Sequence, residues 1–260
     1  MNFARRQFCH LGIFLLFFLG FSTRSKAKDI PFEHVVVDTE FWGDCKAMGD
    51  MDGDGFVDLV LANRDWLIWY AYPHWTRTVI SREAQNFTTD MEVGDIDKDG
   101  DLDVIVPDGP LGKLQWFENP GPTGDPAKDA WKPHLIGHHE SYGHDVEVGD
   151  FDGDGALDVV TRPKGTQVYI WMQNHPDSWT QRIIHCPPGE GLTIGDIDKD
   201  GDPDVIIGGR WYEASGDIVN GPWAEHIYAN WSHGDTYPKM GDINGDGRPD
   251  IVLTPSEGSH

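Results

Sequence analysis

The stretch GDMDGDGFVD at residues 49–58 decides the fold, because it recurs four more times along the chain. The later copies are GDIDKDGDLD at 94–103, GDFDGDGALD at 149–158, GDIDKDGDPD at 195–204 and GDINGDGRPD at 241–250. Counted from the first Asp, each copy has an acidic or amide side chain at the first, third, fifth and ninth places and Gly at the sixth. This Gly permits the positive φ of a tight turn. Inward-pointing carboxylates on such a turn suit a hard cation such as Ca²⁺, which takes about six to eight oxygen ligands.

The repeated pattern therefore predicts one calcium site per copy, because carboxylates this close would repel one another without a cation. Asn244 is a neutral ligand and is expected to weaken the fifth site modestly. The expected metal ligands are Asp50, Asp52, Asp54, Asp58, Asp95, Asp97, Asp99, Asp103, Asp150, Asp152, Asp154, Asp158, Asp196, Asp198, Asp200, Asp204, Asp242, Asn244, Asp246 and Asp250.

The loop resembles the first nine places of the EF-hand calcium loop, but two features argue against a true EF-hand. The bidentate Glu of the twelfth place is missing. The flanks, such as Val57–Leu61 and Asp103–Val106, are rich in β-branched residues and predict strands rather than helices.

The spacing of the copies is the second informative feature. Successive motif glycines at 49, 94, 149, 195 and 241 lie 45, 55, 46 and 46 residues apart. A four-stranded propeller blade takes roughly 40–50 residues. Two further elements recur in phase, an aromatic stretch such as Leu67–Tyr70 and a Trp-led stretch such as Trp75–Ile80. Each period thus predicts strand A, acidic loop, strand B, strand C and strand D, with the tryptophans packed between blades.

These residues resemble the FG-GAP and VCBS repeat family, whose blade motif is found in the calcium-bearing propeller of integrin α chains. The resemblance spans roughly residues 30–254. It implies an all-β propeller of four-stranded blades, with Ca²⁺ in each loop between strands A and B on the bottom face. It says little about function, because one fold hosts many activities.

The two ends of the repeat region bear on blade number. Pro31–Val36 is similar to Trp223–Tyr228 and is expected to form a strand D that helps to close the ring. Lys239–Asp242 and Asp250–Leu253 predict strands A and B of a fifth blade, after which no strand C is visible. The chain either forms five blades, the last of them degenerate, or is part of a longer seven-bladed propeller whose further blades would be its partners. We favour the second interpretation.

Residues 1–27 carry four basic residues, no acid and a short apolar run at Leu11–Phe21, which predicts a signal peptide. Arg5-Arg6 also resembles a twin-arginine export signal. We expect residues 28–260 to form the propeller domain of a secreted or periplasmic, bacterial protein without membrane insertion after signal removal.

The formal net charge of −24 argues against nucleic acid as a partner, since proteins that bind it neutralise phosphates with Lys and Arg. It also argues against anionic membranes. Cys45 and Cys186 fall at different places in the repeat and are expected to be free, buried thiols.

The first functional hypothesis is a binding module that recognises a glycan or an extracellular protein. Its ligand would contact the top-face loops, which join strand D to strand A and strand B to strand C. An acid precedes each strand A and predicts an acidic ring there: Asp44, Asp90, Asp145, Glu190 and Asp235. The candidate ligand-binding residues are Arg64, His138, His139, Asp145, Glu190, Trp231, His233 and Asp235.

The alternative is a carbohydrate-active enzyme of the eliminase type, such as a polysaccharide lyase or an aldosulose dehydratase. The stretch WFENPG at 116–121 is similar to bacterial sugar-processing members of the family. His144 or Tyr142 would act as the base. Arg162 or Arg210 would neutralise the developing charge. Asp145, His233 and Asp235 would be further metal ligands. The sequence leaves open whether the protein is an enzyme.

Overall fold

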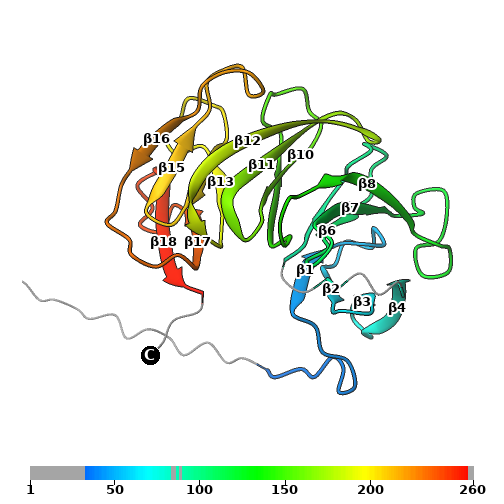
Figure 1. Cartoon of the computed structure of the whole chain (residues 1–260). Coiled ribbons are helices and arrows are strands. Elements are labelled where there is room, and N and C mark those ends of the chain that lie inside the picture. Colours follow the sequence, from blue (N-terminus) through cyan, green and yellow to red (C-terminus); the bar gives the residue numbers. More distant parts are fainter. Residues whose placement is uncertain (1–32, 83–85, 88–89, 257–260) are drawn as a thin grey trace, which may run out of the picture. The chain divides into compact units, whose positions relative to one another are not determined.

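The computed structural model describes residues 33–82, 86–87 and 90–256 (Figure 1). The chain divides into two units, Met1–Val36 and Val37–His260, and every strand belongs to the second. The predicted signal peptide lies outside the described residues. Within those residues no helix is long and apolar enough to cross a membrane.

The strands form four antiparallel sheets of four strands and a fifth sheet of two, each built from consecutive strands. Blade 1 holds β1 (Cys45–Gly49), β2 (Asp58–Ala62), β3 (Leu67–Ala71) and β4 (Thr76–Ser81). Blade 2 holds β5 (Glu92–Gly94), β6 (Asp103–Pro107), β7 (Lys113–Glu118) and β8 (Lys132–His138). Blade 3 holds β9 (Asp145–Gly149), β10 (Asp158–Arg162), β11 (Gly165–His175) and β12 (Ser178–Gly189). Blade 4 holds β13 (Thr193–Gly195), β14 (Asp204–Ile207), β15 (Arg210–Glu213) and β16 (Ala224–Ile227). The fifth sheet pairs β17 (Thr236–Gly241) with β18 (Asp250–Pro255).

Each acidic loop joins the first two strands of its sheet, as predicted. The register places the ninth-place Asp opposite the motif Gly in all five sheets, for example Gly49 opposite Asp58 and Gly241 opposite Asp250. Strands, not helices, therefore flank the loops, and the all-β blade architecture predicted from the sequence is confirmed.

The hydrophobic cores lie between consecutive blades. Val60 and Trp69 of blade 1 pack in one cluster with Val104 and Phe117 of blade 2. A second cluster joins blades 2 and 3, and a third joins blades 3 and 4. Because both faces of a middle blade are covered, every residue of β6 and of β10 is buried. This explains the apolar runs at their centres, Val104–Val106 and Val159–Val160, which do not alternate with polar residues.

The first strands of the sheets are neighbours in chain order: β1 contacts β5, β5 contacts β9, β9 contacts β13, and β13 contacts β17. Residues just before these strands are therefore brought together from distant parts of the sequence. Figure 1 shows the same order, from the blue β1 to the red β18.

One prediction about the ends of the repeat region is wrong. A strand D was expected at Pro31–Val36, of which the structure describes Glu33–Val36, and these four residues form no strand. A strand D needs a strand C to pair with, and within 33–82, 86–87 and 90–256 the sheet of β17 and β18 has none. Closure of the sheets into a ring stays a prediction.

Two smaller predictions have different outcomes. Cys45 and Cys186 are buried and form no disulfide within the described residues, as expected. The tryptophan prediction holds for Trp131, which is buried between blades 1 and 2. It fails for Trp75, because the short turn of its hairpin gives this residue a φ of 54° and sets its ring edge-on to Tyr72 at 5.4 Å.

Candidate metal loops and ligand cavity

The acidic loops are held in shape by their own backbone. The first-place carboxylate of Asp50 accepts from the N–H of Asp54 at 3.0 Å and of Gly55 at 2.8 Å. In the fifth loop, Gly247 N–H donates to Asp242 at 2.8 Å in the same way. The sixth-place glycines all have positive φ, between 79° and 104°. The turn that the sixth-place Gly predicts is therefore present in all five loops.

The fourth place also has positive φ, which the sequence interpretation missed. It is glycine in three loops, but Lys98 and Lys199 adopt φ of 62° and 66°. A side chain is disfavoured in this region. Lys199 uses its position to reach the next loop, where its ammonium group donates to the Gly247 carbonyl.

The ninth-place aspartates of the first four loops are buried and accept hydrogen bonds from the loop backbone. Asp58 is 1% exposed and accepts hydrogen bonds from Met51 N–H at 3.1 Å and from Trp69 Nε1–H at 2.9 Å. Burial raises the pKa of Asp103 to about 8 and that of Asp204 to about 7. Burial, followed by neighbouring carboxylates, also raises the pKa of Asp52.

The loops fit a cation by their donor set. Carboxylate oxygens lie within 4.8 Å of one another in four loops, in the groups Asp50, Asp52 and Asp58; Asp95, Asp97 and Asp99; Asp150, Asp152 and Asp158; and Asp196, Asp198 and Asp204. Such sets of hard oxygens match the preference of Ca²⁺. Repeated Asp clusters that can bind metal ions are thus a property of the fold.

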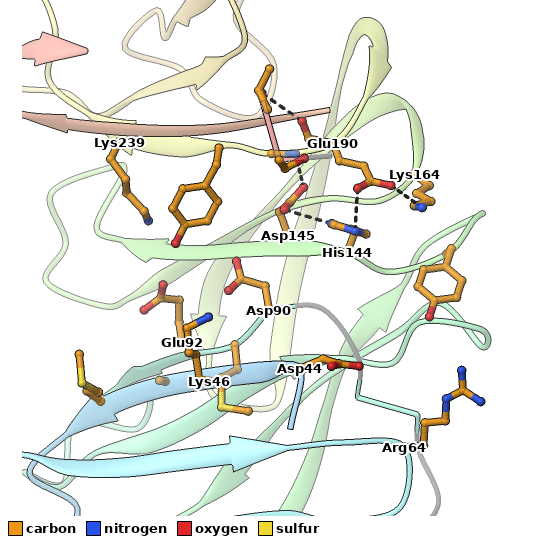
Figure 2. A pocket seen from close by; sticks show the side chains of 18 residues that line it. Asp44, Lys46, Arg64, Asp90, Glu92, His144, Asp145, Lys164, Glu190 and Lys239 are labelled. Atoms are coloured by element: carbon orange, nitrogen blue, oxygen red, sulfur yellow. Dashed lines mark hydrogen bonds and ion pairs between the residues drawn. The ribbon is translucent and has the colours of Figure 1, made fainter. Parts of the chain in front are cut away.

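A large cavity lies along the first strands of the blades and has a volume of about 820 Å³. Figure 2 shows its lining, in which charged side chains of both signs face the space. Acids come from several blades, with Asp44 and Asp90 just before β1 and β5. The predicted residues Arg64, Tyr142, His144, Asp145 and Glu190 all line this cavity.

His144 is the most constrained of these side chains. Its Nδ1 lies 3.1 Å from Asp145 Oδ1, and its Nε2 lies 2.9 Å from Glu190 Oε2. Lys164 Nζ lies 2.5 Å from the other oxygen of Glu190. The backbone of Gly191 donates to Asp145 Oδ2 at 2.6 Å. Figure 2 shows this chain of interactions along one wall of the cavity.

A second group of acids sits deeper among the first strands. Burial, followed by the charge of Asp145, raises the pKa of Asp90 to about 7. Burial and the charge of Glu147 raise the pKa of Glu92 to about 7. Lys239 Nζ lies 3.0 Å from Glu147 Oε1. The sequence interpretation named Asp90 but missed Glu92, Glu147 and Lys239, because they lie within strands, where charged residues are usually solvated.

A smaller pocket of about 50 Å³ gathers four other predicted residues: Arg162, Arg210, Trp231 and His233. Arg162 is buried, and its guanidinium donates to the carbonyls of Glu190 at 2.8 Å and Gly191 at 2.7 Å. The structure therefore separates Arg162, Arg210 and His233 from His144, with which the eliminase hypothesis had grouped them.

Three predicted residues lie outside both cavities. His138 is exposed at the end of β8. His139 is buried with its Nε2 2.7 Å from Thr161 Oγ1, and burial lowers its pKa to about 4. Asp235 forms a parallel bridge with Glu190 through its backbone.

The FG-GAP-like repeat model matches residues 50–106, 95–161 and 150–207, which together cover more than half of the chain. Integrin alpha pat-2 of Caenorhabditis briggsae is 33% identical over 92 residues, 31% of this chain, and the match spans only 7% of that protein.

Two solved structures resemble most of the chain at low identity. The Vibrio cholerae biofilm matrix protein Bap1 has a TM-score of 0.46 at 13% identity, covering 80% of this chain and 34% of its own. A Tc holotoxin pore from Photorhabdus luminescens has a TM-score of 0.44 at 14% identity, covering 82% of this chain and 11% of its own. Likenesses at this level carry no functional information.

Proposed function

We propose that this chain, which belongs to the FG-GAP-like repeat family, is an exported calcium-binding blade domain. In this proposal the domain binds a glycan through its large cavity. The blades are the scaffold, and Ca²⁺ in the acidic loops would fix the hairpins that carry the cavity-lining strands. Binding sites on such scaffolds are built from loops and strand ends that differ between repeats.

The observation that carries the proposal is the chemistry of the cavity lining. Carboxylates of Asp44, Asp90 and Glu92 face the same space as Lys46 and Arg64. Carboxylates accept hydrogen bonds from sugar hydroxyls, while ammonium and guanidinium groups donate to sugar oxygens. A cavity of about 820 Å³ lies within the range of small-ligand pockets.

An exported location supports this choice of ligand. The basic, apolar and acid-free segment at residues 1–27 is typical of a signal peptide. An exported protein meets polysaccharides, and the strongly acidic chain disfavours nucleic acid. An extracellular protein ligand is the second possibility within the same class of function.

His144 favours binding over the eliminase mechanism. Both of its ring nitrogens face carboxylates, Asp145 and Glu190, which accept hydrogen bonds but do not donate them when ionised. Because both ring nitrogens are engaged by carboxylates of the protein, neither is directed toward a substrate proton. In this arrangement His144 positions Glu190 at the cavity wall.

A glycan array with the calcium-loaded protein, followed by calorimetric titration of the best hit, tests the proposal. Glu92→Gln and Arg64→Gln should each weaken binding about tenfold, and Asp65→Asn on the exposed turn after β2 should leave it unchanged. Formation of unsaturated uronate from an acidic polysaccharide, lost in His144→Ala, would instead establish the eliminase. Retained affinity in both cavity variants would exclude the cavity as the glycan site.

A further inference from the structure

The small pocket beside the large cavity is chemically different from the rest of the molecule. The whole chain has 44 acidic and 20 basic residues. Among the described residues that line this pocket there is no Asp or Glu, whereas Arg162, Arg210 and His233 all contribute. Its remaining lining comes from prolines, glycines, Ile207 and the indole of Trp231. It is a local cationic site in an acidic protein.

Arg162 supplies a buried positive charge to this pocket. The residue is 3% exposed, at the end of β10. Its guanidinium donates to three backbone carbonyls, those of Glu190, Gly191 and Pro187, and it lies beside the Cys186 thiol. Within the described part of the chain it makes no ion pair with a carboxylate. Buried charges in proteins are normally paired, so an unpaired guanidinium at a pocket wall favours an anion there.

Two residues that line this pocket, Arg162 and Trp231, each also carry an unused N–H donor. Nε of Arg162 and Nε1 of Trp231 are buried, and neither has a hydrogen-bond partner among the described residues. Buried donors are rarely left without an acceptor, so each such case asks for an explanation. An oxyanion in the pocket would supply acceptor oxygens and a counter-charge together.

Arg210 and His233 provide the outer side of the pocket. Arg210 also forms an ion pair with Glu225 on β16, whose side chain is 42% exposed and therefore well hydrated. A solvated partner of this kind holds its arginine weakly. Arg210 can consequently turn toward a ligand at little cost.

A thin wall of backbone separates the two cavities. Glu190 N–H donates to the Gly234 carbonyl at 3.1 Å, and Thr236 N–H donates to the Glu190 carbonyl at 3.1 Å. Glu190 and Thr236 line the large cavity, while Gly234 lines the small pocket. A ligand in the large cavity is thus adjacent to the cationic pocket.

We propose that the small pocket binds the oxyanion of an acidic ligand, a carboxylate or a sulfate, and so selects acidic glycans over neutral ones. The volume of about 50 Å³ holds one such group rather than a sugar ring. This inference deepens the proposed glycan function and rests on it for the identity of the whole ligand, but not for the anion itself.

The anion is tested without any glycan. Inorganic sulfate and acetate are titrated into the calcium-loaded protein at constant ionic strength while the indole N–H resonance of Trp231 is followed by NMR. A saturable shift of that resonance is expected, together with at least a tenfold weaker response in Arg210→Gln. Arg182→Gln is the matched control, because it removes the same charge from a half-buried arginine of β12. An unmoved Trp231 resonance, or equal losses in the two variants, would overturn the proposal.

The acidic glycan is tested with trigalacturonate, its methyl ester and a sulfated neutral trisaccharide. The acid or the sulfated form should bind about tenfold tighter than the ester, and Trp231→Phe, which keeps the ring but removes the donor, should reduce that preference. Whichever of the two charged probes binds more tightly shows whether the pocket prefers a carboxylate or a sulfate. Equal binding of the acid and the ester through the large cavity would contradict this inference but leave the proposed function standing. Sulfate binding at Trp231 without any glycan binding would contradict the proposed function but leave the anion site standing.

Discussion

The rings of Trp116 and His134 lie face to face, with centroids 4.2 Å apart and planes inclined by 12°. Trp211 and His226 repeat this stack in blade 4 at 4.1 Å and 14°. In both blades the histidine Nε2 also contacts a glutamate at the end of the third strand, at 2.6 Å for Glu118 and 2.7 Å for Glu213.

Blades 2 and 4 share more than this stack. Both have Lys at the fourth loop place, as Lys98 and Lys199, and Asp at the seventh, as Asp101 and Asp202. Blades 1 and 3 have Gly at the fourth place and an apolar residue at the seventh. Blades 1 to 4 therefore alternate with a period of two blades, superimposed on the period of one.

Replacing His134 by Ala should lower the free energy of unfolding by ~2 kcal/mol, because the variant loses an aromatic stack and two hydrogen bonds. His134 bridges Glu118 in its own blade and Asp177 in blade 3, the latter at 2.7 Å. Urea unfolding at saturating Ca²⁺ measures the loss. Thr78→Ala, at the equivalent register position of blade 1, should cost less than ~0.5 kcal/mol. Similar losses in the two variants would contradict the bridging role.

Asn119 connects two blades through its side-chain amide. Nδ2 donates to the Met51 carbonyl of the first acidic loop at 2.9 Å and to the Leu102 carbonyl at 3.0 Å. Asn119→Ala would leave these buried carbonyls without a donor and should cost ~2–3 kcal/mol. Asn174→Ala is the control, because its amide also makes two hydrogen bonds but is exposed. Its cost should stay below ~0.5 kcal/mol in the same urea titration.

Asp90 makes stability depend on pH. Its pKa is raised from 3.8 to about 7, so the folded state favours the protonated form. The contribution of the protonated Asp90 carboxyl to the free energy of unfolding is complete below pH ~4 and is lost as the pH rises through ~7. Asp90→Asn, which mimics the protonated form, should therefore gain ~1–3 kcal/mol over the wild type at pH 8 and almost nothing at pH 4.

The measurement is the difference in unfolding free energy between wild type and Asp90→Asn from pH 4 to 8, at fixed Ca²⁺. Effects of pH on the metal loops are common to both proteins and cancel. Asp44→Asn, which changes the exposed acid before β1, serves as the control. A difference that does not grow between pH 4 and 7 would rule out the assigned direction of the shift.

Removing metal should lower the melting temperature strongly. A ligand at about 100 times its Kd contributes ~2.7 kcal/mol per site, and the chain has five acidic loops. EDTA should shift the melting midpoint downward, and excess Ca²⁺ should restore it. Asp54→Asn should reduce the response to Ca²⁺, while Asp65→Asn should not. A midpoint that does not move in EDTA would argue decisively against structural calcium.

Much of this fold is predictable because its signals are local. The loop glycines, the acids at alternating places and the aromatic third strands each specify conformation within ten residues. Predicted strands such as Leu67–Tyr70 and Asp103–Val106 coincide with β3 and β6 to within one residue. The blade architecture follows from repetition of these short patterns.

The site is less predictable because it depends on which strands become neighbours. His144 was singled out from its loop, but its two carboxylate partners come from its own blade and from the Glu190 segment, 46 residues away. Arg162 was expected to face a substrate beside His144. It instead lines the separate small pocket, where its guanidinium is buried against backbone carbonyls because β10 is covered on both sides by neighbouring blades. A strand D at Pro31–Val36 was predicted from its similarity to Trp223–Tyr228, which does not show whether a partner strand is present.

The amide bridges between blades also bear on how the ions leave. Gln173 repeats the role of Asn119 one blade later, since its Nε2 donates to the Ile96 carbonyl of the second acidic loop at 3.1 Å. The first and second loops are thus each tied to the blade that follows. In a linear array with nearest-neighbour coupling, disorder in one unit is passed to the next. Chelator titrations should accordingly be steeper than those of five independent sites, with the blades losing their cations as a cooperative series.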